Sequence, residues 1–302
     1  MHEDLIGPLL RKDLGVEAGA IRPLTGGEVG RVFRVDAAGA SYAVKFVQAR
    51  SEPPFSDEPV DDRVYGSRWS NLVPAHTLLR ANGIAVPALH AHGTLPDERL
   101  NYAILDYLDG DPDDGSPAWS ACVGRVLGRM HSLTRPYPGW VDMQPADAVH
   151  WPSAFATSFK GWQARAKAHL SPALLRAVAR RCEPLLAALG EPEQFVFSHT
   201  DGFQGILKKT GDWALLGVID IEDHQFTDQR FVLAGFELSR AFYGPFDPVF
   251  WGAYAAFRPV DPSYAAFKPL FQTYYLLVWT WVFRGRPSLL EPAVQRLERV
   301  ID

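Results

Sequence analysis

Residues 195–228 alternate apolar runs with polar loops, and two of the runs are followed by an isolated carboxylate. The run Phe195–Phe197 leads to Asp201, and the run Leu215–Ile219 ends at Asp220. This pattern predicts short strands whose ends hold two acids at fixed positions on one scaffold. Two carboxylates placed in this way suit general-base catalysis, Mg²⁺ binding, or both.

Composition excludes several classes of protein. The chain has 302 residues and a formal net charge of −5, so no broad basic surface indicates a nucleic-acid partner. It lacks a run of about 18 apolar residues that could span a membrane, and its charged, amphipathic N-terminus does not resemble a signal peptide. Cys122 and Cys182 show no metal-type spacing and are expected to be reduced, buried thiols. We therefore expect a cytoplasmic enzyme with no membrane partner.

The first hundred residues are predicted to form a small, β-rich region. A helix is expected over residues 2–14, and a second over residues 69–82, with Pro74 in its first turn or at a kink and Gly83 at its end. Strands are expected over residues 32–35, 42–47, 86–89 and 102–105, with a hairpin turn over residues 36–39.

Two features of this region suggest a phosphate site. Gly26 and Gly27 lie between residues 21–24, where the strand pattern begins, and the predicted strand 32–35, so backbone N–H groups without Cβ atoms nearby can approach a phosphate closely. Lys45 is embedded in an apolar strand, although unpaired lysines are rarely buried. A plain hairpin and a structural lysine are the alternatives.

The remainder is predicted to be mostly helical. The polar, Gly- and Pro-rich segment 109–117 is the candidate boundary between an N-lobe, residues 1–108, and a C-lobe, residues 109–302. A short strand pair in the C-lobe is expected to carry the carboxylates. His131 and the many aromatic residues of the last third are expected in the core. Helices are expected over residues 119–133, 152–170, 172–189, 231–243, 247–257, 263–283 and 287–301.

Five segments, taken in order, resemble motifs of one known family. They are TGGEVGRVFRV (25–35), YAVKF (42–46), YAILDYLDGD (102–111), VLGRMHSL (126–133) and SHTD with GVIDIEDHQFTD (198–201 and 217–228). On these segments the chain resembles the aminoglycoside phosphotransferase (APH), kinase-like family. The resemblance implies an α+β, two-lobed protein-kinase-like fold, with a small antiparallel β-sheet N-lobe and a mostly helical C-lobe.

The resemblance also implies a nucleotide site for ATP or GTP. Lys45 is expected to contact the α- and β-phosphates, and Gly26 and Gly27 to cover them. Backbone groups of Asp106 and Leu108 are expected to bind the purine edge. Leu105 is expected at the back of that pocket.

The two carboxylates then take separate roles. Asp201 is expected to accept the proton of an acceptor hydroxyl, or to orient that hydroxyl, and Asp220 to hold Mg²⁺. His199 is expected to tie the loop of Asp201 to the segment after Asp220. The implied activity is transfer of the γ-phosphate to a small hydroxylated molecule, such as an aminoglycoside-like compound, a sugar or an amino alcohol. The enzyme is expected to be a monomer or homodimer.

The sequence departs from the family pattern at three places. The family's metal-binding Asn falls at Ile206, so Gln204 is the amide predicted to bind the metal. Thr200 stands where the family has Gly, which predicts a different backbone path because β-branched residues tolerate positive φ poorly. The predicted helix 69–82 has no acid to pair with Lys45.

Two hypotheses of function therefore stay open. In the first, the chain is an active small-molecule kinase, in which Glu58, Asp61 or Asp62 from the loop before that helix, or the phosphates of the bound nucleotide, could serve as the partner of Lys45. Alternatively, it is a catalytically degenerate member that binds a nucleotide or metabolite.

Overall fold

The computed structural model describes residues 2–24, 30–48, 64, 68–110, 116–200, 206–209, 212–243 and 248–301, and for residues 206–209, 212–214 and 239–243 it describes the backbone. The predictions for Gly26, Gly27, Asp201 and Gln204 lie outside the described residues. So do those for Glu58, Asp61 and Asp62.

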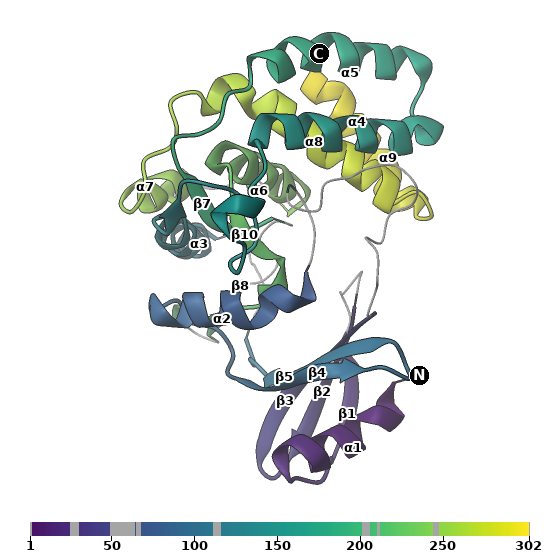
Figure 1. The fold of residues 1–302 in the computed structure, drawn as a ribbon, viewed down its shortest axis with the longest axis vertical. Coiled ribbons are helices and arrows are strands. Elements are labelled where there is room, and N and C mark those ends of the chain that lie inside the picture. Colours follow the sequence, from purple (N-terminus) through teal and green to yellow (C-terminus); the bar gives the residue numbers. More distant parts are fainter. Residues whose placement is uncertain are drawn as a thin grey trace. The chain divides into compact units, whose positions relative to one another are not determined.

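The described residues form a mixture of strands and helices (Figure 1). The strands are β1 (Ile21–Leu24), β2 (Gly30–Ala37), β3 (Ala40–Gln48), β4 (Leu89–Leu95), β5 (Leu100–Asp106), β6 (Thr134–Arg135), β7 (Phe195–His199), β8 (Ile206–Lys209), β9 (Asp212–Val218) and β10 (His224–Thr227). The α-helices are α1 (Glu3–Leu14), α2 (Leu72–Ala81), α3 (Pro117–His131), α4 (Trp151–Ala166), α5 (Pro172–Ala188), α6 (Gln229–Tyr243), α7 (Val249–Ala255), α8 (Tyr264–Val282) and α9 (Pro287–Ile301).

The chain divides into two compact units, each described below by itself. Unit 1 comprises Met1–Pro54, Leu78–Pro112 and Gly205–Ile219, and unit 2 comprises Phe55–Thr77, Asp113–Gln204 and Asp220–Asp302. Among the helices in the described part of the chain, none has the length and apolar character needed to cross a membrane.

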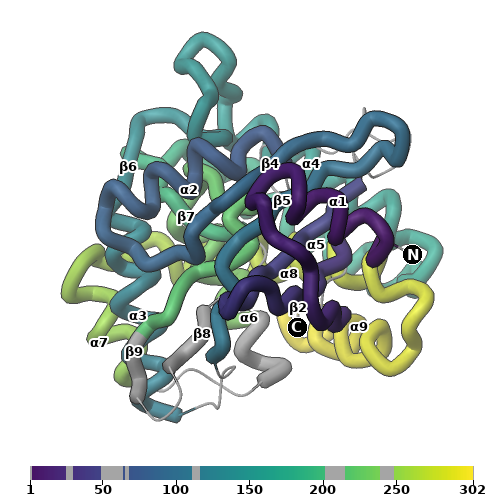
Figure 2. The backbone as a smooth tube through the Cα atoms, turned by 90° about the horizontal axis from the view of Figure 1, so that it is seen from below, coloured from purple at the N-terminus to yellow at the C-terminus, as the bar shows by residue number. Residues whose placement is uncertain are grey.

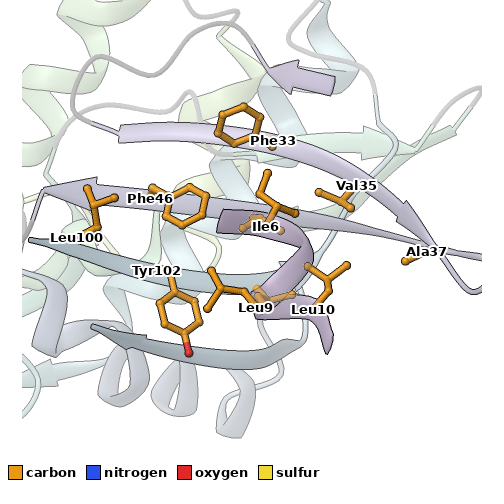
Figure 3. Close-up of a cluster of buried hydrophobic side chains, with 11 residues drawn as sticks. Ile6, Leu9, Leu10, Phe33, Val35, Ala37, Phe46, Leu100 and Tyr102 are labelled. Carbon is orange, nitrogen blue, oxygen red and sulfur yellow. The ribbon is translucent and has the colours of Figure 1, made fainter. Parts of the chain in front are cut away.

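Unit 1 is built on a five-stranded antiparallel sheet with the order β1-β2-β3-β5-β4. Helix α1 lies across one face of this sheet (Figures 1 and 2). Its apolar residues Ile6, Leu9 and Leu10 fall on one helical face and are buried against sheet residues that include Phe33 and Phe46 (Figure 3). The predicted helix over residues 2–14 and the amphipathic character that suggested it are thus confirmed.

The β2–β3 hairpin turns more tightly than predicted. Both strands extend beyond the predicted bounds, and Ala38 and Gly39 form the turn with φ values of 48° and 81°. Positive φ at both central residues is the hairpin geometry that matches the right-handed twist of strands. The predicted hairpin is confirmed, with its turn at two residues instead of four.

The strand predicted over residues 86–89 is wrong, because the strand begins at Leu89 and continues to Leu95. Along β4 the side chains alternate between partly buried and exposed, with His90 and His92 on the exposed side. Strand β4 is at the sheet edge, so one side of the period-two pattern can be polar. Pro87 in the apolar run before it has no N–H to donate to a ladder.

The helix predicted over residues 69–82 is confirmed. A 3₁₀ turn at Trp69–Asn71 precedes α2, and Pro74 lies in the first turn of α2, where its missing N–H costs no helical bond. Gly83 follows the helix with φ of 65°, a left-handed conformation that glycine adopts without strain.

Unit 2 contains a three-stranded antiparallel sheet, β10-β7-β6, surrounded by helices. The expectation that one strand pair carries both carboxylates is wrong. Strand β7, before Asp201, pairs with β10 and β6, whereas β9, before Asp220, pairs with β8 in a separate hairpin. Strand β10 escaped prediction because three of its four residues are polar, yet all four are buried.

Aromatic residues form the core of unit 2, as predicted. Phe155 of α4 and Phe231 of α6 make ring contacts with Phe271 and Tyr274 of α8, and Phe231 also stacks on Tyr275. Rings in offset or edge-to-face contact stabilise a core beyond their buried area. This packing brings α4, α6 and α8 together around one cluster.

His131 at the end of α3 is fully buried and belongs to this core, also as predicted. Gln229 donates from Nε2 to the Tyr254 hydroxyl over 2.7 Å, which leaves the Tyr254 O–H to donate to His131 Nδ1 over 2.7 Å. The His131 Nε2–H then donates to Ser198 Oγ over 3.0 Å. This order of donors and acceptors requires a neutral imidazole.

The free energy of unfolding is expected to fall in mild acid because of His131. Burial lowers the pKa of His131 to about 3, whereas an unfolded histidine titrates near 6.5. Below about pH 6.5 the unfolded chain therefore binds a proton that the folded chain excludes, a loss of about 2 kcal/mol between pH 7 and pH 5. Urea unfolding at both pH values should show this loss reduced in His131→Asn. It should be retained in the control His92→Asn, and equal pH dependence in all three proteins would contradict the prediction.

Candidate active site

Lys45 lies in the middle of the unit 1 sheet. Strand β3 places it opposite Val32 of β2 and Ala103 of β5, and its side chain is half-buried. A Cβ on Gly30 would lie 2.9 Å from the Phe46 carbonyl oxygen and 3.6 Å from Lys45 Cε. Because Gly30 has no Cβ, the backbone of β2 can lie close to the Lys45 side chain. Gly30 directly follows the segment that contains Gly26 and Gly27.

The residues predicted to surround the purine, Leu105, Asp106 and Leu108, are called the hinge segment here and lie at the end of β5 or just after it. Leu105, 9% exposed, pairs with Ala43 of β3, and Asp106 donates its amide to the Ala88 carbonyl oxygen over 3.0 Å. The Asp106 carboxylate accepts hydrogen bonds from the protein itself, from Ala88 N over 3.2 Å and through contact with His90 Nε2 at 2.7 Å. These contacts hold the carboxylate beside the start of β4, and the backbone of Asp106 is the part predicted to bind the base edge.

Leu108 presents a backbone amide that no described residue accepts from. Its carbonyl accepts from the Gly110 amide over 3.1 Å, and the preceding Tyr107 amide donates to Ser41 over 3.0 Å. An N–H that is not part of a ladder at the end of a sheet can bind an acceptor atom of a planar base. The predicted role of Leu108 requires such an amide, and that role stays a prediction.

Strand β9 lies against this hinge segment inside unit 1. The Val218 amide donates to the Ala85 carbonyl oxygen over 2.9 Å. A Cβ on Gly217 would lie 2.5 Å from Leu108 Cδ1 and 3.6 Å from Pro87 Cδ. Gly217 was not predicted from the sequence, although a glycine inside an apolar strand is a known sign of close approach.

Gly217→Val is expected to weaken nucleotide binding about tenfold. The new Cβ would meet Leu108 Cδ1 at 2.5 Å, and the two γ-methyl groups of valine would add further bulk beside Leu108, and overpacking of this kind costs about 1–3 kcal/mol. Isothermal titration calorimetry with AMP-PNP and Mg²⁺ measures the effect. Gly190→Ala is the control, because a Cβ there meets no atom within 4 Å. An unchanged Kd for Gly217→Val would show that Leu108 does not contact the nucleotide.

Asp220 follows β9 after one intervening residue and is partly exposed. It adopts a left-handed conformation, with φ of 54° and ψ of 50°, and precedes a 3₁₀ turn at Ile221–Asp223. Aspartate tolerates this conformation better than most residues, and strained backbone is often found at functional sites. The conformation thus supports a functional role for this carboxylate.

The end of β7, which lies just before Thr200 and Asp201, contacts the segment that follows Asp220. His199 pairs with His224 of β10, their rings meet edge to face at 4.9 Å, and His199 Nε2 lies 3.9 Å from Asp223 Oδ2. Burial first, and then the neighbouring His199, holds the pKa of His224 well below its ordinary value. His199 thus makes the contacts expected of its predicted structural role.

Thr200 does not adopt the positive φ that a family glycine would allow. Among the described residues other than glycine, positive φ occurs at Ala38, Arg99 and Asp220. Thr200 instead uses both its amide and its hydroxyl to donate to the Asp223 carbonyl oxygen, each over 3.3 Å. The hydroxyl bond to Asp223 is one that glycine cannot make, and the change of backbone path relative to the family stays a prediction.

Asn71 is a buried residue of this region that sequence analysis missed. Its Nδ2 donates to the carbonyl oxygens of His224, over 2.5 Å, and Glu222, over 3.3 Å, and its Oδ1 accepts from the Val141 amide over 3.0 Å. It therefore fixes the chain just after Asp220. A single asparagine at the start of a helix gives no sequence signal for partners so far along the chain.

The acids that could attract a cationic acceptor are largely engaged within unit 2. Asp228 is fully buried and paired with Arg230, Glu237 is paired with Lys268, and Glu222 is 3% exposed. In the described part of the chain no group of three or more His, Cys, Asp or Glu residues is arranged to hold a metal ion. Asp220 is thus the described member of the predicted Mg²⁺ site, and Gln204 lies outside.

An antiparallel five-stranded sheet bearing a half-buried lysine, together with a mostly helical unit, defines a kinase-like phosphotransferase fold, which confirms the predicted fold class. A family model described as the phosphotransferase enzyme family (APH) matches residues 20–267, so the chain belongs to this family. No curated protein matches the sequence.

Solved structures support the same fold over the whole chain. A protein from Thermobifida fusca assigned as a fructosamine-3-kinase has 20% identity and a TM-score of 0.67, covering 97% of this chain and 98% of that chain. A similar assignment from Haemophilus somnus has 16% identity and a TM-score of 0.65, covering 98% and 97%. A thermostable mutant of aminoglycoside phosphotransferase APH(4)-Ia, bound to AMP-PNP and hygromycin B, has 14% identity and a TM-score of 0.67, covering 98% and 97%.

Proposed function

We propose that this protein is a small-molecule kinase that transfers the γ-phosphate of ATP or GTP to a hydroxyl group. The observation that carries the proposal is the arrangement within the unit 1 sheet. Lys45 of β3 pairs with Ala103 of β5, and Leu108, two residues after the end of β5, presents its amide. One rigid sheet can therefore hold both a cation for phosphates and a donor for the base.

The nucleotide is proposed to lie along this arrangement. Lys45 neutralises charge on the α- and β-phosphates, and the backbone of Gly26 and Gly27 covers them. The Leu108 amide and the Asp106 carbonyl bind the base edge, with Leu105 beside the base. The solved APH(4)-Ia complex with AMP-PNP supports a nucleotide as donor for this fold.

The chemistry is assigned to the two carboxylates. Asp201 accepts the proton of the acceptor hydroxyl as its oxygen attacks the γ-phosphorus, and the bond from that phosphorus to the β–γ bridging oxygen breaks. The products are a phosphomonoester and ADP or GDP. Asp220 and Gln204 supply the hard oxygen ligands that Mg²⁺ prefers, and Mg²⁺ would neutralise charge on the phosphates.

A sugar or an amino alcohol is the proposed acceptor class. The buried pairing of Asp228 with Arg230, and the pairing of Glu237 with Lys268, removes acids that a polycationic acceptor would require. Structural similarity to proteins assigned as fructosamine kinases agrees with this class.

A second candidate is a nucleotide-binding protein without catalysis. Ile206, at the position of the family's metal-binding Asn, is the first residue of β8 and pairs with Val218 of β9. An isoleucine in a strand gives no ligand for a second metal ion.

Two measurements separate the candidates. Thermal unfolding with ATP or GTP, with and without Mg²⁺, tests nucleotide binding. Nucleotide consumption across a panel of sugars, amino alcohols and aminoglycosides tests transfer. Binding together with turnover of a panel member supports the kinase, binding without turnover supports the second candidate, and no stabilisation by either nucleotide contradicts both.

A cytoplasmic location is also proposed. Cys122 and Cys182 are buried and free, and burial raises the pKa of Cys122 and raises that of Cys182 to about 11. Buried protonated thiols suit a reducing compartment.

A further inference from the structure

Thr200, the residue directly before the proposed base Asp201, is held from two sides. Its amide and its hydroxyl both donate to the Asp223 carbonyl oxygen over 3.3 Å. Its own carbonyl oxygen accepts from the Tyr275 hydroxyl of α8 over 3.0 Å. We call these three residues the Thr200 clamp.

The surroundings of Tyr275 fix its hydroxyl in place. The side chain is 2% exposed, and its ring stacks on Phe231 with centroids 4.6 Å apart and an interplanar angle of 15°. A Cβ on Gly235 would lie 2.5 Å from Tyr275 Cζ and 2.8 Å from its hydroxyl oxygen. Glycine destabilises a helix interior, so its presence inside α6 is explained by the space that the tyrosine ring occupies.

The Thr200 carbonyl that accepts from Tyr275 is connected through the backbone to the proposed base. The Thr200 carbonyl belongs to the planar peptide group that joins Thr200 to Asp201. Fixing that oxygen, together with the Thr200 amide on the other side of the residue, fixes the plane from which the Asp201 backbone continues. A rotation of this plane would redirect every atom that follows, and small displacements of a catalytic group cost large factors in rate.

We propose that Tyr275 is a positioning residue for phosphoryl transfer, acting through the Thr200 clamp on the orientation of Asp201. This inference rests on the proposed function and adds to it a residue from α8, far from the motifs in the sequence. It also explains threonine in place of the family glycine: the β-branched side chain restricts rotation and adds a hydroxyl bond to Asp223.

The neighbouring Tyr274 provides a matched control for Tyr275→Phe. Tyr274 is also fully buried in α8, but its hydroxyl contacts Ser158 Oγ at 2.8 Å and accepts from Trp162 Nε1 over 3.0 Å, both in α4. Each Tyr→Phe change removes one buried hydroxyl. Because Tyr274→Phe removes bonds to both Ser158 and Trp162, it is expected to lower Tm at least as much as Tyr275→Phe, whereas turnover should respond only at position 275.

The kinetic experiment uses MgATP and MgGTP as probes. The reaction measured is their hydrolysis to ADP or GDP and inorganic phosphate. Tyr275→Phe is expected to lower kcat by about tenfold while KM for the nucleotide stays within about twofold of wild type. Tyr274→Phe should leave both within about twofold. Equal kcat in the two variants would overturn the proposal. If Tyr275→Phe does not fold, Thr200→Val should lower kcat and Thr200→Ser restore it, and equal kcat in these two variants would overturn it as well.

Amide hydrogen exchange separates this inference from the proposed function. A wild-type protein that neither hydrolyses ATP or GTP nor transfers phosphate to any member of the acceptor panel would contradict the proposed kinase, and exchange then decides on the clamp alone. Peptides covering residues 196–203 should exchange faster in Tyr275→Phe than in wild type and Tyr274→Phe. The same exchange in both variants would show that the Tyr275 hydroxyl does not hold this loop.

Discussion

Asp220→Asn is expected to lower turnover by about a thousandfold, since removing one group that stabilises transition-state charge costs about 10²–10³ in kcat and this one also binds the metal. The change replaces a charged oxygen ligand by a neutral one at the proposed Mg²⁺ site. Asparagine also tolerates the left-handed backbone that Asp220 adopts, with φ of 54°. The fold around the 3₁₀ turn at Ile221–Asp223 should therefore survive, and the loss should come from charge.

The measurement combines turnover with Mg²⁺-dependent stabilisation by nucleotide. A ligand at one hundred times its Kd stabilises the folded state by about 2.7 kcal/mol, so loss of the metal contribution is visible as a smaller rise in Tm. In Asp220→Asn the rise should no longer depend on Mg²⁺. The comparison variant Asp201→Asn should lose turnover and keep the Mg²⁺ dependence. If Asp220→Asn retained that dependence, Asp220 would not hold the metal.

Local periodicity predicted the elements that bury one clear face. The spacing of Ile6, Leu9 and Leu10 marks a single helical side, and this side covers the unit 1 sheet. Alternation around Val35 and Val44 marked the hairpin of β2 and β3 in the same way. In both cases the apolar residues whose spacing predicted the element are also the residues buried in the core of unit 1. The sequence pattern and the packing therefore come from the same side chains.

Elements whose polar residues are buried could not be predicted in this way. Strand β10 contains His224, Gln225 and Thr227, all fully buried, and its place in the sheet depends on β7 and on the hydrogen bond from Gln225 Nε2 to the Val64 carbonyl oxygen. Such a segment has no apolar periodicity, because partners remote in sequence offset the cost of burying its polar groups.

The candidate site shows the same division. Lys45, Asp106 and Leu108 were predicted from motif resemblance, and the structure places all three on the β3–β5 part of one sheet or shortly after it. Gly217 and Tyr275 were missed, since their importance comes from one close approach and one hydrogen bond across long stretches of chain. Motifs identify residues that contact a ligand, but the residues that hold the motifs in place emerge only from the folded structure.

Arg230→Met is expected to lower the free energy of unfolding by about 3–5 kcal/mol, the range for breaking one side of a buried ion pair. The Asp228 carboxylate is 0% exposed, and it accepts from Arg230 Nη2 over 2.6 Å and from the Arg230 amide over 2.8 Å. Burial lowers the pKa of Arg230, but the hydrogen bonds and charge of Asp228 outweigh burial and the net pKa is raised, so the guanidinium stays charged. Methionine would leave the buried Asp228 carboxylate with the hydrogen bond from the backbone N–H of residue 230 and without a counter-charge.

The arginine also joins three segments of unit 2, which adds to the expected loss. Its Nη1 donates to Ser263 Oγ at the start of α8 over 3.0 Å, and its Nη2 donates to the Gly190 carbonyl oxygen over 3.1 Å. Removing the guanidinium leaves these acceptors without a donor as well. Methionine can still fill part of the volume beside Phe267, whose ring lies 5.0 Å from the guanidinium carbon.

Urea unfolding of four proteins isolates the ion-pair contribution. Arg11→Met is the control, because the Arg11–Glu17 pair at 2.9 Å has side chains 54% and 75% exposed and should contribute less than about 1 kcal/mol. The double variant Arg230→Met with Asp228→Asn should recover part of the loss, since the unpaired buried charge is then gone. A loss in Arg230→Met no larger than in Arg11→Met would mean that water reaches Asp228. If the double variant instead lost more free energy of unfolding than Arg230→Met alone, the hydrogen bond from the backbone N–H of residue 230 to Asp228 would contribute more to stability than removal of the unpaired charge restores.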